Sequence, residues 1–244
     1  MTDDQVVRLI QADMKRAGLY HGAVDGDWGP QSRRAYATLL AQADLGPAPP
    51  VQPAPPPERP ATGGRLAILI GHNATSQGAV RVTDGRTEYD WNDDLAQMIR
   101  ANDPARVQVF RRTHGGGYRA EIRRAYDQIA AWRPDAILEL HFNAFSPDAH
   151  GCEMLYNGSA AGARLADALQ RATLAALGNR DRGIKVLSAE NSRGGPSVHA
   201  LPGVPTIITE PYFGSNPREC VNAGIKMRAI ADAQFRAAMT FIAA

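Results

Sequence analysis

The chain has 244 residues with a formal net charge of +2, and 44% of its residues are hydrophobic. This balanced charge gives no reason to expect a polyanionic partner such as a nucleic acid. No stretch of the sequence reaches the roughly 18 consecutive apolar residues of a membrane span. The amino terminus is acidic and lacks the basic start and apolar core of a secretory signal. The cysteines, Cys152 and Cys220, have no metal-binding spacing, and we expect both to be reduced.

The first 45 residues predict a small helical module. Apolar residues recur with helical spacing from residue 6 to residue 17, and a second helix is expected to begin near Pro30. Residues 20–30 between them are dense in turn formers, and Asp25-Gly26 suits a tight turn. A module of this size without metal or disulfide has only a marginal core, which favours binding over catalysis.

The module resembles the small three-helix peptidoglycan-binding domain. In that family a helix with a glutamine precedes the patterns G-x-Y-x-G and V-D-G-x-[FW]-G and a further helix. The matching positions here are Gln11, 18–20, Gly22, 24–26, 28–30, Ser32 and Ala35, whereas residues 39–42 depart from the usual Phe-Gln. The resemblance implies binding to the cell wall, with Tyr20, Asp25 and Trp28 as candidate contacts. A purely structural role in the turn or the core is the alternative for Asp25 and Trp28.

Residues 46–64 are rich in proline and glycine and mark the clearest boundary in the chain. Proline removes amide donors and fixes φ, so neither helix nor sheet is expected there. The segment should behave as a stiff spacer that rises roughly 3.1 Å per residue. Because structureless loops of this length are uncommon inside compact domains, the sequence predicts a module over 1–45, a linker over 46–64 and a second module over 65–244.

The second module alternates strands with helices, which predicts a sheet layered with helices. We expect strands over 66–70, 107–110, 137–140, 153–156 and 206–209, and helices over 88–100, 118–132, 160–177 and 221–244. The apolar run at 137–140 is typical of a central strand that is covered on both faces.

Four polar residues stand at the ends of these elements. His72 and His141 follow strands, Glu88 opens a helix and Glu210 ends the last strand. In open α/β sheets, ligands bind outside the carboxyl ends of the strands. Two imidazoles and a carboxylate form a common catalytic zinc shell with one open position, and a further carboxylate is suited to proton transfer. The spacing alone is not diagnostic, because the chain has no H-E-x-x-H helix.

Four blocks in this module resemble the zinc-dependent N-acetylmuramoyl-L-alanine amidases of the amidase-3 class. They are residues 68–72, Glu88 with Asn92 and Leu95, residues 140–144, and residues 205–216, in the order of that family. The resemblance implies an α/β fold with a twisted, mostly parallel sheet flanked by helices. It also implies Zn²⁺ held by His72, Glu88 and His141.

The same resemblance assigns two further residues, and the chain departs from the family at two places. Glu210 becomes the catalytic acid–base, and Asn143 would orient the metal ligands or bind substrate. Asn73-Ala74 replaces the Gly-Gly of the family, and Glu139 replaces a small polar residue. Because positions 139 and 141 share one face of a strand, Glu139 is either a partner that fixes the His141 tautomer or a competing ligand.

The sequence thus predicts an endolysin-like peptidoglycan hydrolase that degrades the cell wall. Zinc-activated water would cleave the amide between N-acetylmuramic acid and L-alanine. We expect a monomeric lysis enzyme of a phage or phage-like kind, with phage or bacterial origin left open, made in the host cytoplasm without a signal peptide and acting on bacterial peptidoglycan in the periplasm after release. Nucleic acid and a membrane span are not expected. The alternatives are a zinc peptidase acting on wall stem peptides and a non-catalytic wall-binding protein.

Overall fold

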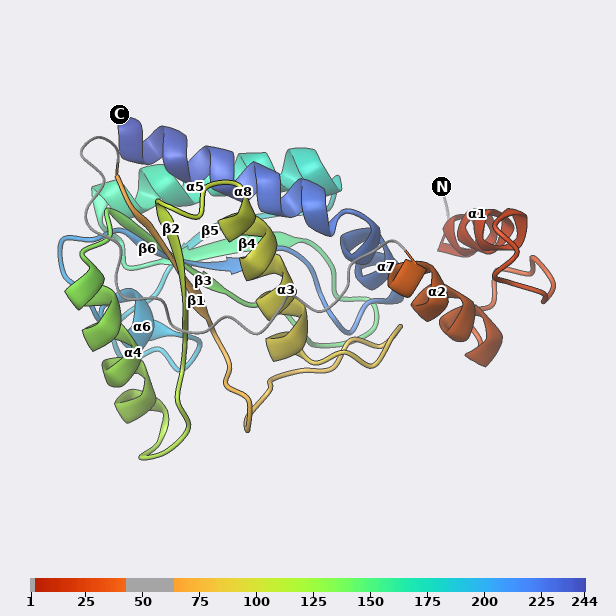
Figure 1. The fold of residues 1–244 in the computed structure, drawn as a ribbon, viewed down its shortest axis with the longest axis horizontal. Helices are drawn as coiled ribbons and strands as arrows, with labels where there is room; N and C mark the ends of the chain where they lie inside the picture. Colours follow the sequence, from red (N-terminus) through yellow and green to blue (C-terminus); the bar gives the residue numbers. More distant parts are fainter. Residues whose placement is uncertain (1–2, 43–63) are drawn as a thin grey trace.

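The computed structural model describes residues 3–42 and 64–244. Figure 1 shows a sheet with helices on both faces and two further helices, α1 and α2, beyond one end of it. All but the last residue of the predicted linker, 46–64, lies outside the described residues. Within the described ranges, no helix combines the length and apolar character needed to cross a membrane.

Six strands form one sheet in the order β2-β1-β3-β6-β4-β5. They are β1 (Leu66–Ile70), β2 (Val107–Arg111), β3 (Ala136–Leu140), β4 (Cys152–Tyr156), β5 (Asp181–Val186) and β6 (Thr206–Glu210). Strands β2, β1, β3 and β6 run parallel, whereas β4 is antiparallel to β6 and parallel to β5. The expected mostly parallel sheet is confirmed, and the carboxyl ends of its four parallel strands meet at one edge.

Helices cover both faces of this sheet (Figure 1). Helices α3 (Glu88–Ala101), α5 (Ala160–Leu177) and α8 (Met227–Ala243) pack over one face. Helix α4 (Tyr118–Trp132) and the short α6 (Gly195–Val198) lie on the other. Helix α7 (Pro217–Ile225) leads from β6 into α8.

The central strands supply side chains to two separate cores. Ile68 and Leu138 pack with the α3, α5 and α8 layer, whereas Leu69 and Ile137 pack against α4. This alternation follows from the two-residue period of a strand. All five residues of β3 are buried, so the prediction of a central strand covered on both faces is confirmed. The buried Glu139 shares the α4 side with Ile137.

Parts of the second module differ from the sequence prediction. Strand β5 was not predicted, because all six of its residues are at least partly exposed and it lacks an apolar run. The short α6 was not predicted either. The single helix expected over 221–244 is wrong: α7 and α8 are separate helices that meet at Lys226. Both cysteines are buried and free of disulfides.

Helices α1 (Asp3–Arg16) and α2 (Pro30–Gln42) form the described part of the first module. The amide nitrogen of buried Gln11 lies 2.9 Å from Asp25 Oδ1 and 3.0 Å from Ser32 Oγ. Its oxygen accepts a hydrogen bond from the Gly26 amide at 2.9 Å. Gln11 therefore ties the turn segment to both helices. Residues 3–42 contain no third helix of the expected three-helix domain, and the rest of that module lies outside the described residues.

The first module contacts the second directly, with α2 beside α7 (Figure 1). The buried Tyr36 donates its hydroxyl to the Val221 carbonyl at 3.0 Å. Tyr36 and Val221 also share an apolar cluster with Met14. A β-carbon at Gly224 would overlap the Tyr36 hydroxyl, so glycine makes room for this contact.

Candidate metal centre

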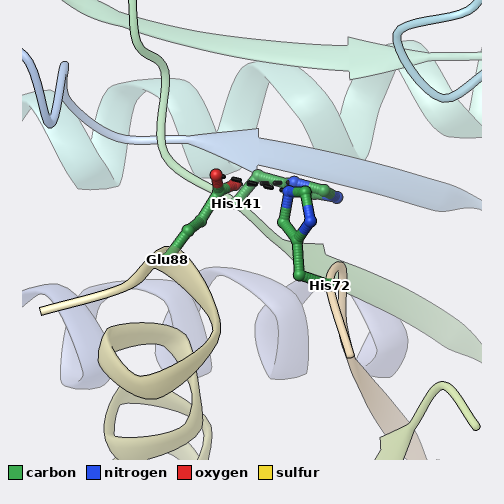
Figure 2. A group of neighbouring side chains, drawn as sticks. All are labelled: His72, Glu88 and His141. Carbon is green, nitrogen blue, oxygen red and sulfur yellow. Dashed lines mark hydrogen bonds and ion pairs between the residues drawn. The ribbon is translucent and has the colours of Figure 1, made fainter. Parts of the chain in front are cut away.

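Figure 2 shows His72, Glu88 and His141 pointing toward one another. Glu88 Oε1 lies 2.8 Å from His141 Nδ1, and Glu88 Oε2 lies 3.3 Å from His72 Nε2. One nitrogen or oxygen donor from each residue lies within 4.8 Å of the other two. The structure therefore brings together the three side chains that the sequence singled out as metal ligands.

Backbone groups fix the carboxylate of Glu88 from two directions. Glu88 is the first residue of α3, directly after the N-cap Thr87. Its Oε1 atom accepts from the Phe142 amide at 3.1 Å and its Oε2 atom from the Ala79 amide at 3.2 Å. The chain after β3 is held in turn, because the His141 amide donates to the Thr209 carbonyl at 3.1 Å. The carboxylate is therefore held in place before any cation binds.

Two glycines leave space for this cluster. A β-carbon at Gly71 would overlap the His141 imidazole. Gly78 has φ +78°, and a β-carbon there would lie 2.7 Å from Glu88 Oε2 and 2.7 Å from the His72 ring. At these two glycines the backbone thus approaches the three clustered side chains more closely than a residue with a β-carbon would allow.

Glu139 contacts the opposite nitrogen of His141. Its Oε1 atom lies 3.2 Å from His141 Nε2, and its Oε2 atom accepts a hydrogen bond from Ser197. The Ser197 hydroxyl also bonds the Tyr126 hydroxyl at 3.2 Å. Since Nδ1 of His141 faces Glu88, a carboxylate at Nε2 fits the role of a partner that fixes the tautomer. This geometry favours that role over the competing-ligand alternative.

The carboxylates and imidazoles of the cluster shift one another's pKa values. Burial disfavours a charged His141, but Glu139 and Glu88 hold its pKa well above the ordinary range. Burial likewise opposes charge on Glu88, yet hydrogen bonds from the two histidines lower its pKa to about 2. Glu88 is thus ionised, and two imidazoles and one carboxylate are donors that zinc prefers. The residues present therefore fit a divalent metal ion.

Glu210 ends β6, the strand next to β3. Its side chain is buried, and its Oε2 atom has no hydrogen-bond partner among the described residues. Burial raises the pKa of Glu210 to about 8, with His141 lowering it and Glu88 raising it. A carboxyl group with a pKa near neutrality is suited to both accepting and donating a proton.

Hydrogen bonds of Asn73 hold the loop after β1, where the sequence departs from the resembling family. The Asn73 carboxamide donates to Glu121 at 2.9 Å and accepts from the amides of Thr75 and Ser76 at 2.9 and 2.7 Å. These bonds form a tight turn in which Asn73 and Ala74 stand where the resembling family has two glycines. The sequence predicted a differently shaped loop here, and these hydrogen bonds define its shape.

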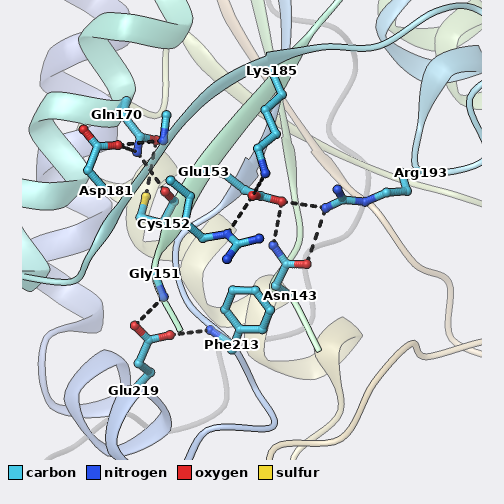
Figure 3. A network of polar contacts seen from close by, with 12 residues as sticks. Asn143, Gly151, Cys152, Glu153, Gln170, Asp181, Lys185, Arg193, Phe213 and Glu219 are labelled. Atoms are coloured by element: carbon cyan, nitrogen blue, oxygen red, sulfur yellow. Dashed lines mark hydrogen bonds and ion pairs between the residues drawn. The ribbon is translucent and has the colours of Figure 1, made fainter. Parts of the chain in front are cut away.

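The remaining predicted residues occupy different environments. Asn143 donates to Glu153 at 3.0 Å and lies in the network of Figure 3. In the first module, Tyr20 is buried and donates to the Ala23 carbonyl at 2.8 Å, and Trp28 packs edge-on against Tyr36. Asp25 accepts from Gln11 and from the Asp27 amide. These contacts give Tyr20, Asp25 and Trp28 structural roles in the module.

Sequence reasoning missed Glu153 as a functional candidate. It is fully buried in β4, where it contacts three basic side chains and Asn143. A signal was present, since a glutamate inside the apolar strand over 152–156 requires buried partners.

Residues 66–238 match the amidase-3 family of N-acetylmuramoyl-L-alanine amidases. The chain belongs to this family. It is 30% identical over 165 residues to the N-acetylmuramoyl-L-alanine amidase LytC of Bacillus subtilis (strain 168), an alignment that covers 65% of this chain. Since the match covers 31% of LytC, the chain spans about a third of that relative.

Solved structures of two amidases and of one endolysin catalytic domain share the fold of this family member. The catalytic domain of CwlV from Bacillus (Paenibacillus) polymyxa var. colistinus superposes with a TM-score of 0.60 at 16% identity, covering 74% of this chain and 98% of that domain. An N-acetylmuramoyl-L-alanine amidase from Clostridium difficile 630 gives 0.60 at 20% identity, covering 75% and 98%. The catalytic domain of the CD27L endolysin gives 0.60 at 20% identity, covering 72% and 97%.

Proposed function

We propose that this amidase-3 family member hydrolyses the amide between the lactyl group of N-acetylmuramic acid and L-alanine in bacterial peptidoglycan. The observation that carries the proposal is the convergence of His72, Glu88 and His141 at the sheet edge where β6 ends in Glu210. All four residues fall within the range that matches the family.

In this proposal His72, Glu88 and His141 hold Zn²⁺. When bound, the ion supplies a Lewis acid for the amide carbonyl and lowers the pKa of a water molecule toward about 7. Glu210 accepts a proton from the attacking water and returns it to the leaving amine of L-alanine. Its burial and its raised pKa of about 8 support both steps.

Glu139 is proposed as a positioning residue in this reaction. By accepting a hydrogen bond from Nε2 of His141, it would leave Nδ1 free to bind the metal. The 3.2 Å separation from Nε2 and the Ser197 hydrogen bond on its other oxygen support this role. Asn143 is proposed to border the substrate, because it follows His141 by two residues and bonds Glu153.

We further propose a modular organisation, with a wall-binding domain over residues 1–45, a linker over 46–64 and the catalytic domain over 65–244. The sequence resemblance to peptidoglycan-binding domains supports the first assignment, and the Gln11 hydrogen bonds show how its turn segment is held. Binding to the wall would raise the local concentration of substrate at the catalytic domain. The enzyme is proposed to act as a monomer.

For the biological setting we propose a role like that of an endolysin, reaching the wall through a membrane lesion made by another protein. The catalytic domain of the CD27L endolysin has the same fold, so the fold is compatible with that role. Cytoplasmic expression should leave cells intact until the membrane is permeabilised. Lysis without permeabilisation would contradict this setting.

Mass spectrometry of digested cell walls tests the proposed reaction. The amidase should release stem peptides that begin with L-alanine and leave intact glycan strands. Activity should disappear on chelation and return when zinc is added. Peptides cut at an internal bond would instead identify a peptidase. A protein that binds walls but stays inert with zinc would be a non-catalytic binder.

A further inference from the structure

Three basic side chains contact the buried Glu153, and Figure 3 labels Lys185 and Arg193 among them. Glu153 Oε1 lies 2.6 Å from Arg193 Nη2, and its Oε2 atom lies 2.8 Å from Arg182 Nε and also contacts Lys185. We call Arg182, Lys185 and Arg193 the basic cluster. Arg182 also lies with its guanidinium 4.9 Å from the centre of the Phe213 ring.

The basic cluster borders the proposed catalytic residues. Glu153 of β4 stands directly opposite Glu210 in the antiparallel pair of β4 and β6, and side chains at such paired positions lie on the same face, roughly 5 Å apart at their β-carbons. Asn143, two residues beyond His141, donates to Glu153 and lies 3.4 Å from Arg193 Nη2. A substrate engaged by Glu210 therefore passes close to these cations.

Cations outnumber carboxylates in the direct contacts of Glu153. Three basic side chains contact its one carboxylate, and Glu210 also interacts electrostatically with Arg193. Glu153 is fully buried, whereas 47% of the Arg193 side chain, 37% of Lys185 and 32% of Arg182 are exposed. The buried carboxylate thus fixes the inner side of each cation, and the outer sides remain open to solvent and to a ligand.

The chemistry of the proposed substrate places negative charge on one side only. In the scissile bond the lactyl carboxyl is already consumed as an amide, so the N-acetylmuramic acid side contributes no carboxylate there. The peptide on the other side carries free carboxylates at its acidic residues or at its end. An arginine and a lysine held side by side are typical ligands for such a group.

We propose that the basic cluster binds a carboxylate of the substrate's peptide arm and so selects acidic over amidated stem peptides. This inference rests on the proposed amidase function and deepens it. Arg193 makes the principal contact, because it has the most exposed side chain of the three and connects Glu153 to Asn143. Its role is binding, so its loss should raise KM more than it lowers kcat.

Matched substrates test the inference on the full-length zinc-loaded enzyme. One is a soluble peptidoglycan fragment whose peptide arm has a free carboxylate after L-alanine, and the other has that carboxylate converted to a carboxamide. At low salt, kcat/KM should be about tenfold higher for the acidic fragment, with the difference mainly in KM. Added salt should reduce this preference, because exposed charges are screened over about 10 Å at 0.1 M ionic strength.

In Arg193→Gln the preference should fall to about twofold or less, and Lys185→Gln should lower it in the same direction. Arg171→Gln is the matched control, since Arg171 is 70% exposed on α5 and pairs with Asp167. It should retain the full preference. Equal kcat/KM for both fragments in the unmodified enzyme would overturn the inference and leave the amidase assignment intact. Equal losses on both fragments in Arg193→Gln would also overturn it. Failure to release any peptide from whole walls would instead contradict the proposed function.

Discussion

Glu139 Oε1 lies 3.2 Å from Nε2 of His141, on the side of the imidazole opposite Glu88. Position 139 is the one charged residue of β3, and it is fully buried. Burying a carboxylate costs free energy unless it is paired. The contacts of Glu139 with His141 and Ser197 supply that pairing. This relationship gives the proposed metal ligand a defined ring orientation.

Replacing Glu139 should therefore weaken metal binding without removing a ligand. In Glu139→Gln we expect zinc affinity to fall by about 10–100-fold, the usual effect of losing a partner of a metal-bound histidine. Competition with a fluorescent chelator measures this change. Asp167→Asn, at a surface pair on α5, is the control and should bind zinc normally. Unchanged affinity in Glu139→Gln would remove the positioning role.

Substitutions at Glu210 and at His141 should distinguish a loss of catalysis from a loss of metal binding. Glu210→Gln removes the proposed proton acceptor but none of the proposed ligands, so we expect one bound zinc and turnover reduced by about 10²–10⁴-fold. His141→Ala should lose both the metal and turnover. Elemental analysis and release of peptides from walls measure the two properties. Substantial lysis by Glu210→Gln would exclude Glu210 from the mechanism.

The sequence predicted this edge of the sheet because local signals mark it. The apolar runs of β1, β3 and β6 identify buried strands, and polar residues at their ends identify the edge where they meet. Strand β5 was not predicted because its residues are at least partly exposed and include Gly183. The boundary between α7 and α8 at Lys226 was not predicted either. Apolar residues recur on both sides of it, and position 226 itself is neither proline nor glycine.

Contacts between distant residues were less accessible to sequence reasoning. The pairing of Glu139 with His141 followed from strand periodicity, because the two residues share a face. The grouping of Arg182, Lys185 and Arg193 around Glu153 depends on the antiparallel placement of β4 and on the unpredicted β5. The Tyr36 contact with Val221 joins residues 185 positions apart, and no local pattern encodes it.

Gly78 offers a steric test of the metal centre. In Gly78→Ala the new methyl group would lie 2.7 Å from Glu88 Oε2 and from the His72 ring, so we expect zinc affinity to fall by at least about tenfold. Gly85→Ala is a matched control, because Gly85 has a similar φ of +74° but open space around its β-carbon position. Both variants carry comparable backbone strain. Equal zinc affinities in the two would contradict the crowding argument.

Deleting residues 1–45 should affect wall binding more than catalysis. We expect binding to insoluble walls to weaken by about tenfold or more, because the local concentration effect of a second binding site is lost. Hydrolysis of soluble fragments should change by less than about twofold. Sedimentation with walls and a soluble-fragment assay measure these effects.

The contact between Tyr36 and Val221 requires a control for this deletion, since removal of the module uncovers Val221 on α7. Circular dichroism should show that the truncated protein is folded. Tyr36→Phe in the full chain removes only the hydrogen bond, worth about 1 kcal/mol, and should bind walls normally. Equal losses of wall binding and soluble hydrolysis in the truncated protein would contradict the modular proposal.

Because of Glu153, the free energy of unfolding should depend on pH in the acid range. Burial opposes its charge, but hydrogen bonds from Lys185, Arg193 and Arg182 lower its pKa from 4.5 to about 2. A carboxylate with a depressed pKa stabilises the folded state above its unfolded pKa, and this contribution disappears as the pH falls through the folded value. At pH 7 we expect Glu153→Gln to lose about 1–3 kcal/mol of unfolding free energy, a range discounted for its partly exposed partners. Urea denaturation should show this difference shrinking between about pH 4.5 and about pH 2, and a constant difference across that window would show that packing, not charge, gives Glu153 its effect.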